Sequence, residues 1–193
     1  MGDDVTDGEV TEEWTGPRHV VLERIGHAPR CAALLDIWKA ARVGNVMAAR
    51  SALDPIILAK AGLLPFVWVL ERDAGGACFY RLIGESIRRN FNMPMRGRYV
   101  HEIFDQDMSR LISSRCERIL SEAEIMFTSG RVYRDGKAVY YARRLVLPLR
   151  DEDGTARFLI GTVDQSEMGR DTNRVDNPRF TNDFVAFVGV ESI

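Results

Sequence analysis

Apolar residues recur at helical spacing in two stretches of the chain, with polar residues mostly on the opposite side. The first stretch begins near Pro29, and its apolar positions are Cys31, Leu34, Leu35, Trp38 and Ala41. The second begins at Asp105, and its apolar positions are Met108, Leu111, Ile112, Cys116, Ile119, Leu120 and Ala123. Each pattern predicts an amphipathic helix. A shorter helix is predicted after Asp54-Pro55, because aspartate caps helices and proline suits their first position.

Short runs of apolar, aromatic and β-branched residues mark five predicted strands. The first two, 65–71 and 78–83, are joined by the turn Asp73-Ala74-Gly75-Gly76 and should form a hairpin. The other three span residues 125–133, 139–149 and 156–163, with turns containing Asp-Gly between them. The order of elements predicts an α+β fold, with a five-stranded antiparallel sheet, helices on one face and an N-terminal helical extension.

The two ends of the chain differ from its middle in composition. Residues 1–28 are predicted to be a flexible acidic segment, although the stretch 17–27 fits either a short strand or a short helix. Residues 29–168 are predicted to form the folded domain with its leading helix, and residues 169–193 a C-terminal extension. Within that extension, the apolar run 184–188 is expected to dock on this domain or on another chain.

The composition is close to that of an average soluble protein, with 46% hydrophobic and 28% charged residues among 193. A formal net charge of −2 argues against a dedicated nucleic-acid binder, which usually carries a strongly basic face. Arginine supplies nearly all of the 26 positive charges, since the only lysines are Lys39, Lys60 and Lys137. This bias either reflects a GC-rich genome or includes arginines that hold anions in a forked geometry.

Three well-separated cysteines, Cys31, Cys78 and Cys116, have neither zinc-site nor Cys-x-x-Cys spacing. Free thiols are typical of a reducing compartment. The N-terminus lacks the apolar core of a signal peptide, and no window reaches the apolar length that spans a bilayer. A cytoplasmic protein is therefore expected.

The order strand–strand–helices–strand–strand–strand resembles that of a PAS domain. The motifs that carry the resemblance, over about residues 30–166, are Leu35-Asp36-Ile37-Trp38, Ala49-Arg50-Ser51-Ala52-Leu53-Asp54-Pro55, Tyr80-Arg81-Leu82-Ile83-Gly84 and Gly97-Arg98-Tyr99. They are similar to a bacterial single-domain PAS subfamily in which a Leu-Asp-x-Trp helix precedes the fold. The resemblance implies a sensory or protein-interaction module that binds a small molecule between its sheet and its helices.

The resemblance also implies an interface and an output. PAS domains often dimerise through a leading helix, so Leu34, Leu35 and Trp38 are the predicted homodimer interface. Because the chain has no room for a kinase or cyclase beside the domain, the signal is expected to pass to a separate partner protein. The alternatives are a ligand-free interaction scaffold and a small enzyme on an α+β cone.

Alternation along the strand 139–149 places Tyr140 and Arg144 on one face, and analogy with related flavin sensors turns that face toward the pocket. The predicted ligand-binding residues are Arg81, Tyr99, Val100, Arg131, Tyr140, Arg144 and Val163. The three arginines could hold a small anionic molecule bidentately. Alternatively, they pair with carboxylates of the protein at Glu71, Glu85 or Glu102, or they lie exposed.

The sequence identifies no cofactor. In flavin photosensors of this superfamily, a Gly-Arg-Asn-Cys run supplies a reactive thiol, whereas the corresponding run here ends in Val100, which argues against flavin photochemistry. Haem would need an axial ligand, and His101, the only histidine of the predicted folded domain, is better explained as a surface or half-buried residue. Metal-ligand spacing and the common catalytic motifs are missing, so the chain is not expected to be an enzyme.

Overall fold

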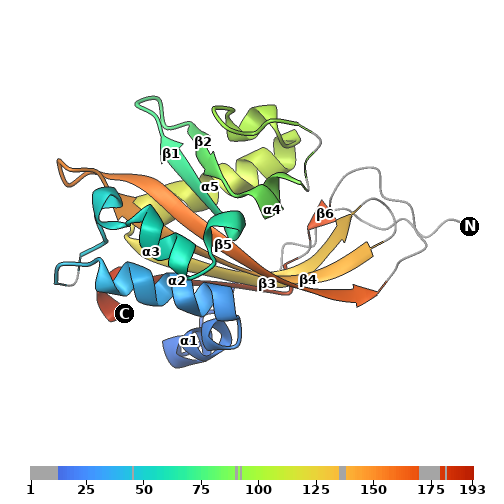
Figure 1. Ribbon diagram of the computed structural model, residues 1–193, viewed down its shortest axis with the longest axis horizontal. Helices are drawn as coiled ribbons and strands as arrows, with labels where there is room; N and C mark the ends of the chain where they lie inside the picture. Colours follow the sequence, from blue (N-terminus) through green and yellow to red (C-terminus); the bar gives the residue numbers. More distant parts are fainter. Residues whose placement is uncertain are drawn as a thin grey trace, which may run out of the picture.

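The computed structural model describes residues 13–44, 46–89, 91, 93–134, 138–169, 179–180 and 182–193 (Figure 1). Its helices are α1 (Arg18–Gly26), α2 (Pro29–Ala40), α3 (Pro55–Lys60), α4 (Glu85–Arg88) and α5 (Gln106–Ser121). Its strands are β1 (Val67–Arg72), β2 (Cys78–Ile83), β3 (Glu124–Arg134), β4 (Ala138–Arg150), β5 (Ala156–Gly169), β6 (Arg179–Phe180) and β7 (Phe184–Gly189).

The strands form one antiparallel sheet in the order β2-β1-β5-β4-β3-β6, with β7 also paired to β3. The five predicted strands correspond to β1–β5, which confirms the α+β fold class. The structure differs from the five-stranded prediction at the β3 edge of the sheet, where further strands are added. There β7 pairs with residues 124–129, and the short β6 pairs with residues 132–133. The apolar run 184–188 therefore docks on its own domain, as one of the two options expected for it.

Helices cover both faces of the sheet (Figure 1). On one face, α1 and α2 bury Val21, Ile25, Leu34 and Trp38 against the long strands, and each of these side chains is at most 1% exposed. On the other face, α5 packs against β3, β4 and β5. From the sequence, one face of the sheet was expected to contact either the leading helix or a second subunit. In the structure the leading helix, α2, covers that face.

The N-terminal segment that was predicted to be flexible contains an ordered helix. Residues 18–26 form α1, which settles the ambiguity of the stretch 17–27 in favour of a helix. Val21 and Ile25, four residues apart, bury its apolar side against the domain. The expected flexibility of residues 1–12 concerns a part of the chain outside the described residues, and the three domain limits stay predictions.

Local signals in the sequence account for the starts of two helices. The carboxylate of Asp54 accepts a hydrogen bond of 2.7 Å from the backbone N–H of Ile56, which begins α3. The carboxylate of Asp105 accepts one of 2.9 Å from the N–H of Met108, which begins α5. The predicted turn 134–137 lies mostly outside the described residues.

Candidate functional site

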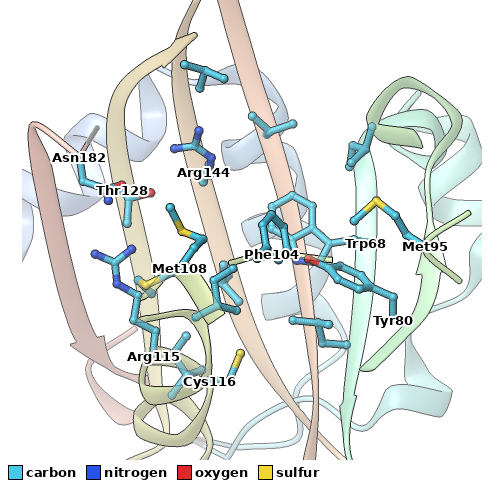
Figure 2. Close-up of a pocket in the computed structure, with 18 of the residues that line it drawn as sticks. Trp68, Tyr80, Met95, Phe104, Met108, Arg115, Cys116, Thr128, Arg144 and Asn182 are labelled. Carbon is cyan, nitrogen blue, oxygen red and sulfur yellow. The ribbon is translucent and has the colours of Figure 1, made fainter. Parts of the chain in front are cut away.

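A pocket of about 190 Å³ lies between α5 and the face of the sheet opposite α2. Most of its wall is apolar. Figure 2 labels Trp68 of β1, Tyr80 of β2 and Met108 of α5 among its side chains. Other apolar members of the wall are Ile112 of α5, Val146 of β4 and Val163 of β5. The segment between β2 and α5 closes the pocket with Phe91, Met95 and Phe104.

The strand register decides which side chains form the floor of the pocket. Thr128 of β3 pairs with Arg144 of β4, and Arg144 pairs with Val163 of β5. Directly opposite residues of antiparallel strands share a face, so these three side chains point to the same side of the sheet. All three line the pocket, which confirms the predicted face for Arg144.

A glycine makes room for the indole ring that lines the pocket at β1. Gly161 of β5 pairs with Trp68, and a Cβ atom at position 161 would lie 2.2 Å from an atom of that ring. Only glycine therefore leaves space for the ring to lie flat across β5. This gives the pocket a broad aromatic wall.

The pocket has a polar side and an apolar side. Figure 2 shows Arg115, Arg144, Thr128 and Asn182 on one side of the pocket. Trp68, Tyr80, Phe104 and Met95 lie on the other side. Among the described residues that line the pocket there is no aspartate, glutamate or histidine.

Arg115 of α5 is a pocket residue that the sequence reasoning did not select. Burial lowers the pKa of its guanidinium group, and the smaller opposing effect comes from the carboxylate of Glu13. A signal was available, because Arg115 follows Ile112 by three residues and precedes Ile119 by four, which places a cation within the apolar stripe of the helix.

The other titratable groups of the pocket are uncharged at neutral pH. A hydrogen bond with Cys78 and burial raise the pKa of the Cys116 thiol well above its usual value. Burial also raises the pKa of the Tyr80 hydroxyl, with smaller contributions from the two thiols. The two arginines are therefore the charged groups among the described residues of the wall.

Of the predicted ligand-binding residues, Arg144 and Val163 line this pocket. Val100 is 2% exposed and belongs to the same hydrophobic cluster, but it lies outside the pocket wall. Tyr140 lines an adjoining hollow of about 180 Å³ together with Arg30 and Phe66, and this hollow shares Val163 with the pocket. The face chosen by analogy with the flavin sensors is thus the correct one, and the pocket occupies only the part of it around Arg144 and Val146.

Arg81 and Arg131 lie elsewhere, so the predicted trio of pocket arginines is not assembled. Arg81 forms an ion pair with Glu71, whose side chain is 2% exposed and also binds Arg157 at 2.6 Å. The internal salt bridge, one of the two alternatives for Arg81, is therefore confirmed. Arg131 is exposed. It lies opposite Tyr141 in the register of β3 against β4, and this register turns its side chain to the other face of the sheet from Arg144.

Tyr99 is half-buried and lies outside the pocket. Its hydroxyl donates a hydrogen bond of 3.1 Å to Asp73, and its ring stacks on His101 with 5.3 Å between ring centroids. His101 is exposed and does not line the pocket. Within the described ranges, no group of three or more His, Cys, Asp or Glu side chains could hold a metal ion.

The contacts of Asp73 predict an acid-sensitive contribution to stability. Hydrogen bonds from the Ala77 backbone, and then from Tyr99 and Gly75, hold the pKa of this carboxyl below its usual value. Its stabilising effect is thus present above an unfolded pKa of about 4 and is lost as the pH falls through the folded pKa. Asp73→Asn should lower the melting temperature at neutral pH and leave it unchanged in strong acid. The prediction is contradicted if the melting temperatures of Asp73→Asn and the parent differ equally at both pH values. Tyr99→Phe removes only one of the hydrogen-bond donors to Asp73, so it should lower the melting temperature less.

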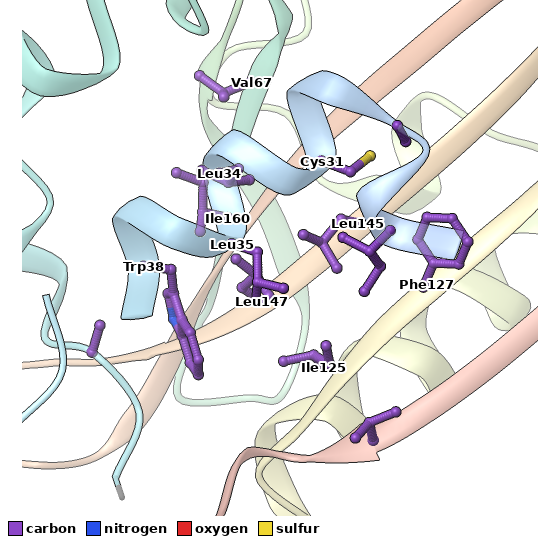
Figure 3. Packing of buried hydrophobic residues seen from close by; sticks show 14 of the residues in the cluster. Cys31, Leu34, Leu35, Trp38, Val67, Ile125, Phe127, Leu145, Leu147 and Ile160 are labelled. Atoms are coloured by element: carbon purple, nitrogen blue, oxygen red, sulfur yellow. The ribbon is translucent and has the colours of Figure 1, made fainter. Parts of the chain in front are cut away.

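The predicted homodimer interface is part of the chain's own core. Leu34, Leu35 and Trp38 are 0%, 5% and 0% exposed, and they pack against the sheet (Figure 3). The indole N–H of Trp38 donates a hydrogen bond of 2.9 Å to the backbone carbonyl of Pro148. The helical stripe was correctly recognised as buried, but its partner is the sheet, so these residues are not available to a second subunit.

Comparison with known proteins finds one family. The family model of the PAS domain matches residues 26–164, which include α2 and all elements from there to most of β5. No curated protein matches the chain. Among the described residues, no helix has both the length and the apolar character needed to cross a membrane.

Proposed function

The chain belongs to the PAS domain family of sensory and signalling modules, and on this basis we propose that it binds a small molecule in its core and signals through a separate partner protein. The observation that carries the proposal is the pocket of about 190 Å³ between α5 and the sheet. Its wall combines a large apolar surface with a few polar groups on one side, which is the usual make-up of a small-molecule site.

The pocket volume limits the size of the ligand. An apolar protein cavity of roughly 150 Å³ is enough to hold benzene. At about 190 Å³, the pocket has room for one ring or a short branched chain with a small polar group. Large planar cofactors such as flavin or haem exceed this volume.

The pocket favours a ligand-binding role over the two alternatives. A scaffold that only contacts other proteins would be expected to fill its core with side chains. An enzyme would need a group able to take or give a proton near neutral pH. Cys116 and Tyr80 hold their protons in that range, and the described wall contains no carboxylate or imidazole, so we propose that the domain is not catalytic.

The contacts of α5 suggest how an occupied pocket could be sensed elsewhere. Arg118, three residues beyond Arg115, binds Glu13 at 2.6 Å and Glu124 of β3 at 2.7 Å. Glu13 in turn pairs with Val185 of β7. A small shift of α5 on ligand binding would therefore change the contacts that hold the N-terminal segment to the sheet. We propose this segment as the element that reports to the partner.

We also propose that the protein forms a homodimer in the cytoplasm. The likeness to PAS domains, which often dimerise, supports the dimer, and its interface must lie outside Leu34, Leu35 and Trp38, which the sheet covers. The three cysteines are free and buried, which supports a reducing compartment. Light scattering over a range of concentrations tests the dimer, and a constant monomer mass would contradict it.

Filling the pocket tests the proposed function. Val146 is 7% exposed and lies in the floor of the pocket, so Val146→Phe would occupy part of the space that a ligand needs. In a thermal-shift screen with small one-ring compounds, the parent protein should be stabilised by some of them. Their affinity for Val146→Phe should be lower by about tenfold or more, because the added ring and the compound would compete for the same space.

The matched control is the same substitution at an exposed position. Val43 is 75% exposed, so Val43→Phe should bind the compounds as the parent does. If no compound stabilises the parent, or if Val146→Phe binds them unchanged while remaining folded, the pocket is not a ligand site.

A further inference from the structure

We infer that the ligand is a small apolar monocarboxylic acid, bound with its carboxylate at Arg115 and Arg144 and its ring or chain against the aromatic wall. This inference rests on the proposed function and adds the chemical class of the ligand. It follows from the separation of polar and apolar groups around the pocket (Figure 2).

Arg115 is placed where it needs an anionic partner. Its side chain extends from the apolar stripe of α5 into the pocket wall, where burial disfavours the charged guanidinium. Among described residues it makes no hydrogen bond or ion pair. Arg115 is half-buried, and even partial burial of a guanidinium group is costly unless an anion and hydrogen-bond acceptors offset its loss of water.

The carboxylates of the protein do not supply that anion within the described pocket wall. The carboxylate that acts electrostatically on Arg115 belongs to Glu13, and it is already bound by Arg118 at 2.6 Å. The described wall contains the cations Arg115 and Arg144 and no aspartate or glutamate. A ligand carboxylate would therefore give Arg115 the anion that the described wall does not supply.

Neutral donors beside the arginines favour the same ligand. The side chain of Thr128 is 1% exposed and lies opposite Arg144 in the sheet. Asn182 lies on the same side of the pocket, where a hydrogen bond of 2.8 Å from Asp183 N–H to the Ser129 carbonyl ties its segment to β3. Hydroxyl and amide donors next to a forked cation are typical of carboxylate binding.

The opposite wall restricts the rest of the ligand. Trp68, Tyr80 and Phe104 present aromatic surface, and Met95 adds a flexible thioether. Such a wall binds an apolar body and has no cation for a second carboxylate. With a pocket of about 190 Å³, a ligand the size of benzoate fits, whereas dicarboxylates, sugars and nucleotides do not match the chemistry.

The test compares benzoate with nitrobenzene, which has the same shape and no net charge. By isothermal titration calorimetry, benzoate should bind the parent protein about tenfold more tightly than nitrobenzene or better, because a charge-assisted bidentate pair is among the strongest polar interactions. Phenylacetate and cyclohexanecarboxylate, each with its neutral amide, extend the comparison to other ring positions and shapes.

Arg115→Gln should weaken the binding of the preferred acid by about tenfold or more and leave nitrobenzene within about threefold. The matched control is Arg110→Gln on the same helix, because Arg110 is exposed and pairs with Asp107. It should bind all the compounds as the parent does. Melting temperatures confirm that both variants are folded.

The outcomes separate this inference from the proposed function. If neutral compounds bind as tightly as their acids, or if Arg115→Gln weakens both equally, the carboxylate assignment is wrong while the pocket remains a ligand site. If none of the acids binds although neutral compounds do, the assignment is equally wrong. If neither acids nor neutral compounds bind, the proposed function fails as well.

Discussion

Replacing Trp38 by alanine is expected to lower the free energy of unfolding by about 3–5 kcal/mol. Trp38 is 0% exposed, and its ring fills the space between α2 and the sheet next to Leu147 (Figure 3). The substitution removes this packing and also leaves the Pro148 carbonyl without the indole donor. Urea denaturation followed by circular dichroism measures the loss.

Two further variants of α2 serve as comparisons for Trp38→Ala. Trp38→Phe keeps most of the apolar volume but removes the donor, so its cost should be smaller, about 1–3 kcal/mol. Asp36 is exposed, so Asp36→Ala should change stability by no more than about 0.5 kcal/mol. A Trp38→Ala variant as stable as Asp36→Ala would show that α2 does not form part of the core.

Gly84→Ala is expected to cost about 3 kcal/mol or more, because no side chain fits between Gly84 and the chain that precedes β1. A Cβ atom at this position would lie 2.4 Å from the backbone carbonyl of Pro65 and 2.5 Å from that of Leu64. Backbone atoms cannot move aside as a flexible side chain can. The Gly84 N–H also donates a hydrogen bond of 2.7 Å to the Val67 carbonyl, so a displaced backbone would disturb the start of β1.

Gly26→Ala is the matched control for this substitution. Gly26 lies in α1 with nothing within 4 Å of the added Cβ atom, so alanine should be neutral or stabilising by about 0.4–1 kcal/mol. If Gly84→Ala melts at the same temperature as Gly26→Ala, the close approach at Pro65 is not a feature of the fold in solution.

The sequence predicted those parts of the fold that depend on local signals. Asp54 and Asp105 begin helices, and the five long strands were recognised from their apolar runs. Alternation along β4 also placed Tyr140 and Arg144 on one face, because side chains on a strand point in turn to opposite sides, and analogy with related flavin sensors chose that face for the pocket. The helix starts, the strands and the alternation need only the residues nearby in the chain.

The site itself was predicted in part, because it depends on how distant strands pair. Arg131 and Arg144 were expected to share a face, but the register places Arg131 opposite Tyr141 and Thr128 opposite Arg144. A shift of one residue reverses every side chain of a strand, and no sequence pattern on β3 decides the register. The pairing of Arg81 with Glu71 was one of two alternatives that only the structure could separate.

The sequence of the leading helix, α2, predicted that one face is buried but not what buries it. A helical stripe reveals that a face is buried, but it does not reveal whether the partner belongs to the same chain or to another. Arg115 is the converse case, because a cation within an apolar stripe indicates a polar group inside the domain. Recognising it required the pocket that α5 forms with the sheet.

The central claim is that the pocket on the α5 face binds a small molecule, and methionine methyl groups test it most directly. Met95, Met108 and Met126 line the pocket, whereas Met47 packs on the core at the other face of the sheet. In protein carrying labelled methionine methyl groups, titration with benzoate and the other one-ring compounds should shift the NMR signals of the first three and leave that of Met47 in place. If no compound shifts the three pocket signals, or if Met47 shifts as much as they do, the claim is contradicted.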